Sequence, residues 1–477
     1  MMSFKYKIGG VLWGLALGTM VQAQSVGVWQ TTVNGQKLLE RQTFPAWQQQ
    51  PAVPDRTIRV DTSVRFQEIE GFGASMTGSS AYLIKGLPSK ARQALMDELF
   101  DVSKGIGLSY LRMSMGASDF SLEAYTYNDL KHGETDAGMK RFGLGIDARD
   151  VVPVLRQAVK VNPEIRLMGS PWSAPAWMKD SGKLEGGQLN PSAYDAYARY
   201  FVKYVKAMEK KGLAVDAVTI QNEPLYESKY PSMGMSAASQ AEFIKKHLGP
   251  LFQANKLQTK IVVYDHNWDR PDYPIEILND PEARKYVHGS AFHCYGGDVS
   301  AMGEVHRAHP DKALYFTECS GGSWAPNWGD NLMWYTRHLL IGTLNNWSRN
   351  VLMWNLALDG QNGPTTNKPR AEGEGNYGCM TCRGIVTIDS QTHQVTRNVE
   401  YYAFAQFSKF VRPGAFRVSS TQLDEGLQNV AFVNTDGSRV LVVLNDTPDD
   451  EKFWMEEGSR AFGYQVPAMS VSTFVWE

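Results

Sequence analysis

Eight short apolar segments occur in series through the middle of this chain, and they constrain its fold more than any other feature. Most of them are followed by a helix-like or long connecting stretch. In chain order they cover residues 69–73, 108–113, 165–169, 218–221, 261–264, 290–293, 314–317 and 351–354. Short apolar runs that alternate with helix-like connections predict parallel strands buried on both faces. Eight such units predict an α/β fold, specifically a (β/α)8 TIM barrel.

Two of the connecting stretches have apolar residues at helical spacing. Residues 88–100 carry Leu95 and Leu99 on one face, and residues 194–208 carry Phe201 and other large side chains in the same way. This amphipathic pattern is typical of helices that cover a sheet.

The pattern changes near both ends of the chain. From residue 395 onward short alternating runs are separated by turns, which predicts an antiparallel β-sandwich. Residues 24–65 are also strand-like, but an isolated pair of strands is marginal in water, so we expect them to complete the C-terminal sandwich. The barrel is then expected over residues 66–394 and the C-terminal part of the sandwich over residues 395–477.

Residues 1–23 have the features of a secretory signal peptide. Lys5 and Lys7 precede an apolar run at residues 8–20, which is too short for a membrane span, and small residues at 21–23 suit a cleavage site. No other stretch is apolar for long enough to span a bilayer. We therefore expect a secreted or periplasmic protein without an integral membrane span, and an uncleaved anchor is the alternative.

Charge and cysteine usage restrict the partners. The chain has 48 Lys and Arg against 50 Asp and Glu, a net charge of -2, which argues against nucleic acid as a partner. Cys379 and Cys382 form a CxxC pair without a second such pair or a suitable histidine cluster, so a local disulfide or two free thiols is favoured over zinc. We expect no metal and no organic cofactor, and the oligomeric state stays unknown.

Two glutamates lie at the ends of predicted strands. Glu223 follows the fourth segment, beside Asn222, and Glu318 ends the seventh. The carboxyl ends of barrel strands meet at one face, so these side chains are expected to converge. A retaining glycosidase needs a protonated acid and an ionised carboxylate about 5 Å apart. Asn222 is placed to bind the sugar 2-hydroxyl.

Eight motifs in order extend this interpretation over nearly the whole mature chain. They are EGFGASMT at 70–77, LRMSMGASDFS at 111–121, GSPWSAPAWM at 169–178, QNEP at 221–224, FHCY at 292–295, TECSG at 317–321, WNLAL at 354–358 and FSKFVRPG at 407–414. In these motifs the chain resembles glycoside hydrolase family 30, which includes glucosylceramidase and the β-1,6-glucanases. The resemblance implies that Glu223 is the acid/base and Glu318 the nucleophile.

The resemblance also implies a set of residues around the sugar next to the scissile bond: Arg112, Asp119, Trp172, Asn222, Tyr295 and Trp354. Arg112 and Tyr295 would keep Glu318 ionised, whereas burial and the charge on Glu318 would raise the pKa of Glu223. Asp119 and Trp172 would bind sugar hydroxyls, and Trp354 would stack on the ring.

Other roles stay open for several of these residues. Arg112 could instead form a structural ion pair, Trp172 and Trp354 could be core residues, and His293 could be either a sugar-binding residue or an ordinary strand-end histidine. Gly78 stands where glucosylceramidase has Asp, so the ceramide-glucoside specificity does not transfer simply.

The sequence thus predicts an exported retaining β-glycosidase that acts on β-glucan, with the β-1,6 linkage favoured. A glucosylceramidase-like exo-β-glucosidase is the alternative within the enzymes, and a xylan-active relative is third. A non-catalytic carbohydrate-binding protein and a metal-dependent hydrolase are more remote. The loop at residues 359–377 is expected to shape the cleft, and endo or exo action is left open.

Overall fold

The computed structural model describes the chain apart from residues 3–25, 44, 50–55, 367–377 and 424–425. Nearly all of the expected signal peptide and much of the loop at residues 359–377 therefore lie outside the described residues. Within the described ranges, every helix is too short or too polar to cross a bilayer.

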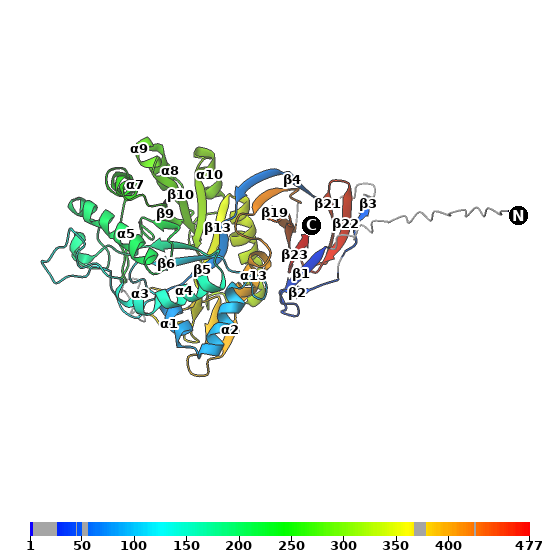
Figure 1. The fold of residues 1–477 in the computed structure, drawn as a ribbon, viewed down its shortest axis with the longest axis horizontal. Helices are drawn as coiled ribbons and strands as arrows, with labels where there is room; N and C mark the ends of the chain where they lie inside the picture. Colours follow the sequence, from blue (N-terminus) through cyan, green and yellow to red (C-terminus); the bar gives the residue numbers. More distant parts are fainter. Residues whose placement is uncertain (3–25, 44, 50–55, 367–377, 424–425) are drawn as a thin grey trace.

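Eight parallel strands close into a barrel in the order β10-β11-β13-β5-β6-β7-β8-β9. Figure 1 shows the strands of the barrel surrounded by helices, with the strand-rich part of the chain beside them. All eight predicted segments are confirmed; Glu223 follows the fourth strand of the barrel and Glu318 ends the seventh, as expected. The strands are β5 (Gly71–Ser75), β6 (Tyr110–Ser114), β7 (Arg166–Ser170), β8 (Ala217–Thr219), β9 (Lys260–Asn267), β10 (Val287–His293), β11 (Ala313–Glu318) and β13 (Ser348–Asn355).

Helices follow the strands and surround the barrel. The two helices predicted from amphipathic spacing are confirmed as α2 (Ser89–Phe100) and α5 (Tyr194–Glu209). The others include α1 (Gly78–Gly86), α4 (Val151–Val161), α6 (Ala237–Phe243), α7 (Gly249–Ala254), α8 (Asp272–Asn279), α10 (Ser300–Ala308), α11 (Trp328–Trp334) and α13 (Val399–Ser408). Their apolar faces pack with the outer side chains of the strands into one large core.

Side chains fill the barrel interior, so the barrel is a packed core rather than a pore. Tyr110, Val262, Tyr315 and Leu352 belong to this inner cluster. At Gly73 an added Cβ would lie 1.9 Å from the Tyr110 carbonyl oxygen, so the close approach of β5 and β6 there requires glycine.

Charged side chains surround Glu70, which directly precedes β5 at the opposite end of the barrel from Glu223 and Glu318. The Glu70 carboxylate accepts from Lys260 at 3.1 Å and pairs with Arg166 at 3.1 Å and Arg349 at 3.5 Å. Its side chain is only 2% exposed, so the three cations compensate a buried charge.

Both chain ends contribute to the β-sandwich, as predicted. A sheet in the order β2-β1-β23-β20-β19-β18-β4-β21-β22-β3 folds around its own apolar core. The short strands at its two edges are β2 (Glu40–Arg41) and β3 (Gln48–Gln49). Its longer strands are β1 (Gly27–Thr32), β4 (Thr57–Glu68), β18 (Phe416–Ser420), β19 (Leu427–Val433), β20 (Arg439–Asn445), β21 (Glu451–Glu457), β22 (Arg460–Val466) and β23 (Ser470–Trp476). The N-terminal strand β1 pairs along its length with β23.

The start of the C-terminal part differs from the expected boundary at residue 395. Strand β17 (Val395–Arg397) pairs with β16 (Val386–Ile388) beside the barrel, and helix α13 follows it before the sandwich strands begin at β18. A short alternating run pairs equally well in a small separate sheet, which explains the early boundary.

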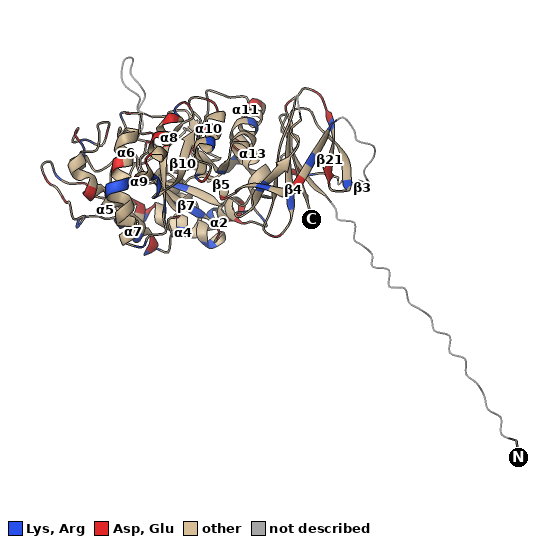
Figure 2. Cartoon of the chain, turned by 90° about the horizontal axis from the view of Figure 1, so that it is seen from above, with Lys and Arg blue, Asp and Glu red and all other residues tan. Residues whose placement is uncertain are grey.

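Helix α13 joins the two domains. The side chain of Gln406 is fully buried; its amide donates to Thr31 at 2.8 Å, and its carbonyl oxygen accepts from Thr473 at 2.5 Å. The helix thus binds one strand from each end of the chain, β1 and β23. Acidic and basic residues are interspersed over both domains (Figure 2), in keeping with the net charge of -2.

Candidate active site

A cavity of about 450 Å³ opens where the barrel strands end. It is lined by Asp119, Trp172, Asn222, Glu223, Tyr226, Tyr230, His266, Asn267, Tyr295, Glu318, Ser320, Trp324, Trp354, Gly378, Cys379, Thr381 and Cys382. Seven of the nine residues predicted for the site are in this lining. The other two, Arg112 and His293, are fully buried directly beneath it and bind the two glutamates.

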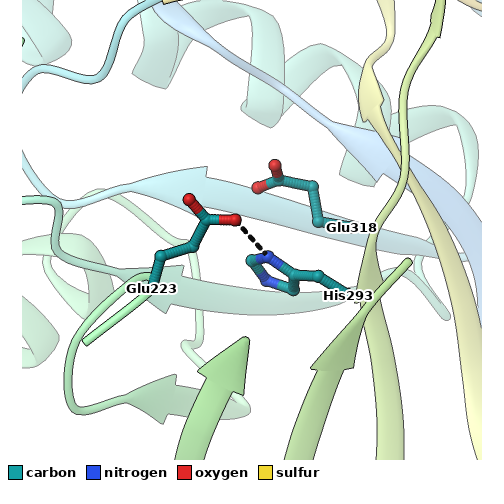
Figure 3. A group of neighbouring side chains, drawn as sticks. All are labelled: Glu223, His293 and Glu318. Carbon is teal, nitrogen blue, oxygen red and sulfur yellow. Dashed lines mark hydrogen bonds and ion pairs between the residues drawn. The ribbon is translucent and has the colours of Figure 1, made fainter. Parts of the chain in front are cut away.

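Glu223 and Glu318 converge, as their strand-end positions predict. One oxygen from each carboxylate and a ring nitrogen of His293 lie within 4.8 Å of one another. Figure 3 shows the His293 ring hydrogen-bonded to Glu223, with the Glu318 carboxylate facing the same space. This spacing suits a nucleophile and an acid on one sugar and is too short for the water that an inverting enzyme places between its carboxylates.

Arg112 on β6 organises the floor of the site. One terminal nitrogen, Nη1, donates to Glu318 Oε2 at 2.5 Å. The other, Nη2, donates to Asn222 Oδ1 at 2.7 Å and to Asp265 Oδ2 at 2.8 Å. The guanidinium also lies over the ring of Trp172, 4.8 Å from its centroid. Arg112 is therefore an internal ion-pair partner of the site itself, which combines the two roles considered from the sequence.

Glu318 is held from two sides. Its Oε1 accepts from the Tyr295 hydroxyl at 2.9 Å, opposite the Arg112 contact. Burial raises the pKa of Glu318, and the nearby charge of Glu223 adds to this, whereas His293 and Arg112 lower it; the pKa lies above its usual value. Arg112 and Tyr295 thus hold the carboxylate in place and limit the effect of burial.

The electrostatics of Glu223 differ from the expectation of a raised pKa. Burial raises the pKa of Glu223, but the hydrogen bond from His293 and the positive charges of His293, His266 and Arg112 outweigh it, and the pKa lies below its usual value. A raised pKa was expected from burial and the charge of Glu318 alone, and the contacts of His293 reverse it. His293 Nδ1 lies 3.1 Å from Glu223 Oε1, so His293 acts on Glu223 rather than as an ordinary strand-end histidine.

Asp265 on β9 was not predicted, although it contacts Arg112, His293 and Glu223. Its carboxylate binds Arg112 and His293, and its backbone carbonyl accepts from the backbone N–H of Glu223 at 3.0 Å. Asp265 ends the same kind of apolar run that drew attention to Glu223 and Glu318. The same strand-end rule would have found it.

Backbone strain is concentrated at this point. Glu223 (φ 46°), Tyr264 (φ 72°) and Asp265 (φ 63°) all occupy the left-handed region that non-glycine residues rarely adopt. Such conformations cost about 1 to 3 kcal/mol each and persist where the surrounding contacts hold them. The pairing of β9 with β10 skips Asp265, since Ala291 pairs with Tyr264 and Phe292 with His266. A β-bulge therefore aims Asp265 into the site.

Aromatic residues form one wall of the cavity. Trp172 and Trp354 stack with ring centroids 4.9 Å apart, and both are almost fully buried. They therefore pack as core residues and also present a surface to the cavity. Asp119 lies in the same wall, where its backbone carbonyl accepts from Thr365 at 2.5 Å, so the described part of the loop after β13 contacts the site.

Several lining residues lie on loops that strand-end reasoning does not reach. Tyr226 and Tyr230 follow Glu223, and Trp324, which is 57% exposed, follows Glu318. An added Cβ at Gly322 would lie 1.9 Å from the Trp324 ring, so the indole lies directly against the glycine backbone. Exposed aromatic surface in a cleft of this kind suits the apolar face of a sugar ring.

All four cysteines form disulfides near the cavity. Cys379 pairs with Cys382, so of the two alternatives left open for the CxxC pair, a local disulfide or two free thiols, the structure has the disulfide. Cys294 pairs with Cys319 and so joins the residues directly adjacent to Tyr295 and Glu318. The pairing of the second disulfide was not predicted.

Glu223, His293 and Glu318 also form the one group in the described part of the chain that is close enough to hold a metal ion. Both ring nitrogens of His293 are already within hydrogen-bonding distance of carboxylates, Nδ1 of Glu223 and Nε2 of Asp265. This arrangement leaves the histidine no free nitrogen as a ligand, so the group fits acid–base chemistry better than metal binding.

A parallel barrel with two glutamates facing each other at strand ends, Glu318 buried and Glu223 partly exposed, defines a glycoside hydrolase. The comparisons with known proteins agree: residues 69–411 match the glycosyl hydrolase family 30 TIM-barrel domain, and residues 414–474 match the glycosyl hydrolase family 30 beta sandwich domain. The chain belongs to glycoside hydrolase family 30.

Two kinds of glycoside hydrolase are among the relatives that match most of the chain. An endo-1,6-beta-D-glucanase of Aspergillus fumigatus is 35% identical over 88% of this chain and 87% of its own length. The lysosomal acid glucosylceramidase of Mus musculus is 30% identical over 86% of this chain and 82% of its own length. Among solved structures, the endo-beta1,6-glucanase BT3312 superposes with a TM-score of 0.87 at 36% identity, covering 95% of this chain and 99% of that one.

Proposed function

We propose that this protein is a secreted retaining β-glycosidase that hydrolyses β-glucan, with β-1,6-glucan as its substrate. The observation that carries the proposal is the approach of Glu223 and Glu318 to within 4.8 Å at the floor of one cavity. Glu223 is the acid/base and Glu318 the nucleophile in this proposal.

The reaction proceeds by double displacement. An oxygen of Glu318 forms a bond to the anomeric carbon, while the bond to the leaving oxygen breaks and that oxygen takes a proton from Glu223. Glu223 then accepts a proton from water as the water attacks the anomeric carbon and releases Glu318. Arg112 and Tyr295 support this role by holding the attacking carboxylate in a fixed orientation.

Sugar-binding roles follow from the same geometry. Asn222 is oriented by Arg112 and lies in the cavity wall beside Glu223, which suits a hydrogen bond to the 2-hydroxyl of the sugar. Asp119 supplies an acceptor for other hydroxyls, and the stacked rings of Trp172 and Trp354 supply an apolar surface.

The linkage is inferred from the relatives. Three curated endo-1,6-beta-D-glucanases are 35% or 36% identical to this chain, whereas the glucosylceramidases are 30% or 31% identical. These values favour a β-1,6-glucanase, and a glucosylceramidase-like exo-β-glucosidase is the second candidate.

Export is supported by the two disulfides. Disulfides persist in oxidising compartments and are rare in reducing ones. Together with the signal-like features of residues 1–23, they favour a secreted or periplasmic protein.

The proposal is tested by incubating the protein with pustulan, laminarin, glucuronoxylan and glucosylceramide. We expect gentio-oligosaccharides from pustulan with the β configuration retained when the products are followed by proton NMR. Activity confined to glucosylceramide would overturn the linkage, and inverted products would overturn the mechanism. Glu318→Gln is expected to abolish hydrolysis while sugar binding stays measurable, and activity is expected to survive exhaustive chelation.

A further inference from the structure

Asp265 contacts Glu223 through its backbone carbonyl, and through its carboxylate it contacts Arg112, the partner of Glu318. Its Oδ2 accepts hydrogen bonds from Arg112 at 2.8 Å, Ser170 at 2.6 Å and Thr219 at 2.7 Å. Its Oδ1 accepts from Thr317 at 2.7 Å and lies 3.0 Å from Nε2 of His293. The side chain has no solvent exposure.

These contacts determine where the protons of His293 lie. Asp265 has a pKa well below its usual value, because Arg112 and the surrounding donors outweigh burial, so it is an ionised acceptor. An ionised carboxylate only accepts, and Nε2 of His293 must therefore carry a proton. The second nitrogen, Nδ1, faces Glu223 Oε1 at 3.1 Å, and one proton occupies that hydrogen bond.

The charges around His293 favour keeping this second proton. Three carboxylates face the His293 ring: Glu223 after β8, Asp265 on β9 and Glu318 on β11. The other polar groups around the ring are His266 on β9, Tyr295 on the loop after β10 and Arg112 on β6. Burial lowers the pKa of His293, but the carboxylates outweigh burial and raise the pKa to about 9.

We propose that Asp265 is a positioning residue for acid catalysis: its side chain fixes the His293 ring so that Nδ1 shares a proton with Glu223, and its backbone carbonyl holds Glu223. The proposal rests on the proposed role of Glu223. When the leaving oxygen takes a proton from Glu223, the proton on Nδ1 moves to Glu223, and His293 becomes neutral with Nε2–H still bound to Asp265.

The bulge in β9 explains how Asp265 contacts the His293 ring with its side chain and Glu223 with its backbone carbonyl. Tyr264 and Asp265 are both left-handed, and the extra residue directs the Asp265 carbonyl toward the backbone N–H of Glu223 while its carboxylate points into the barrel.

The first test is the pH profile of kcat/KM on pustulan for Asp265→Asn. Removing a negative charge next to His293 weakens the hold on the shared proton, so the basic limb is expected to move to lower pH by about one unit. Asp216→Asn is the matched control, because Asp216 is paired with Lys260 at the other end of the barrel. Its basic limb should coincide with that of the wild type.

A purely structural role for Asp265 would lower kcat/KM equally at all pH values, and an unmoved limb would overturn the proposal. Thr317→Val provides a second variant that keeps the charge. It removes one donor from Oδ1, which strengthens the remaining bond to His293, so the limb should move to higher pH; a limb that stays or moves down counts against the proposal.

A second readout does not depend on activity. In ¹⁵N-histidine NMR, the signal that disappears in His293→Gln identifies this residue, and its titration in Asp265→Asn should shift to lower pH than in the wild type. An unchanged titration would overturn the proposal. Absence of pustulan hydrolysis by the wild type would instead contradict the proposed function, and the NMR titration would still test the role of Asp265.

Discussion

Arg112 Nη1 lies 2.5 Å from Glu318 Oε2, and the Arg112 side chain has no solvent exposure. The same guanidinium reaches Asn222 and Asp265 through its other nitrogen. One side chain therefore orients the attacking carboxylate, a sugar-binding amide and the partner of His293. Such a fork cannot be reproduced by an ammonium group.

Arg112→Lys is accordingly expected to lower kcat/KM on pustulan by about 100-fold, the order of magnitude for loss of one positioned donor in an active site. The matched control is Arg166→Lys, since Arg166 pairs with Glu68 and Glu70 at the far end of the barrel. Steady-state kinetics give kcat/KM for Arg112→Lys and Arg166→Lys, and thermal unfolding shows how much of each variant is folded. Equal losses in both variants would contradict the assigned role of Arg112.

Glu223→Gln should slow the cleavage of substrates whose leaving group needs a proton more than that of substrates whose leaving group does not. A glucan linkage needs a proton on its leaving oxygen, whereas an aryl β-glucoside with an acidic phenol does not. We expect hydrolysis of pustulan to fall by at least about 100-fold and formation of the glycosyl-enzyme from the aryl glucoside to continue, seen as a burst of phenol. If the burst is lost together with pustulan hydrolysis, Glu223 is not the acid.

Trp324→Ala should raise KM for pustulan more than it changes kcat for a small aryl glucoside. The exposed indole lies against Gly322 in the cavity lining and offers a stacking surface worth about 1 kcal/mol. Trp334→Ala is the control, because Trp334 is 39% exposed on α11 and does not line the cavity. Equal KM values for wild type and Trp324→Ala would show that no sugar stacks there.

Glu70→Gln should lower stability without changing kcat. It leaves Lys260, Arg166 and Arg349 without their shared buried partner, at a cost of about 3 kcal/mol. Burial raises the pKa of Glu70, but the cations outweigh it, and the folded pKa lies below 4.5. The stabilisation is therefore full above pH 4.5 and is lost as the pH falls through the folded pKa.

Thermal unfolding of the wild type and of Glu70→Gln at several pH values measures the difference in their stability. The Tm gap between wild type and Glu70→Gln should be constant near neutrality and narrow in acid. A gap that widens in acid would mean that the Glu70 carboxylate is not the stabilising form.

Periodicity in the sequence was sufficient to predict the barrel, its eight strands and the contribution of both chain ends to the sandwich. The reason is physical: buried parallel strands are continuous apolar runs, and their carboxyl ends share one face. Glu223 and Glu318 were found because a strand-end acid stands out in such a run. The approach of the two glutamates confirms the predicted convergence, and their catalytic roles stay a proposal.

The sequence could not predict what depends on backbone irregularity. The position of Asp265 at a strand end could be read from the sequence, but the bulge at Tyr264 and Asp265 has no signature in the run from 261 to 264. The contacts from Asp265 through His293 to Glu223 were therefore not predicted, and the expected direction of the Glu223 pKa shift was wrong. Trp324 was missed for another reason. Its place in the cavity depends on the path of a loop after β11, which apolar periodicity does not encode.

The pairing of β1 with β23 has a consequence for synthesis of the chain on the ribosome. Strands β1 and β4 are translated first, yet their partners β18, β21 and β23 are translated last. During most of translation the early strands have unpaired edges, which are templates for association with other chains. A nascent chain that stalls within the barrel would keep these strand edges unpaired, because β1 can pair with β23 only after the end of the chain has been translated.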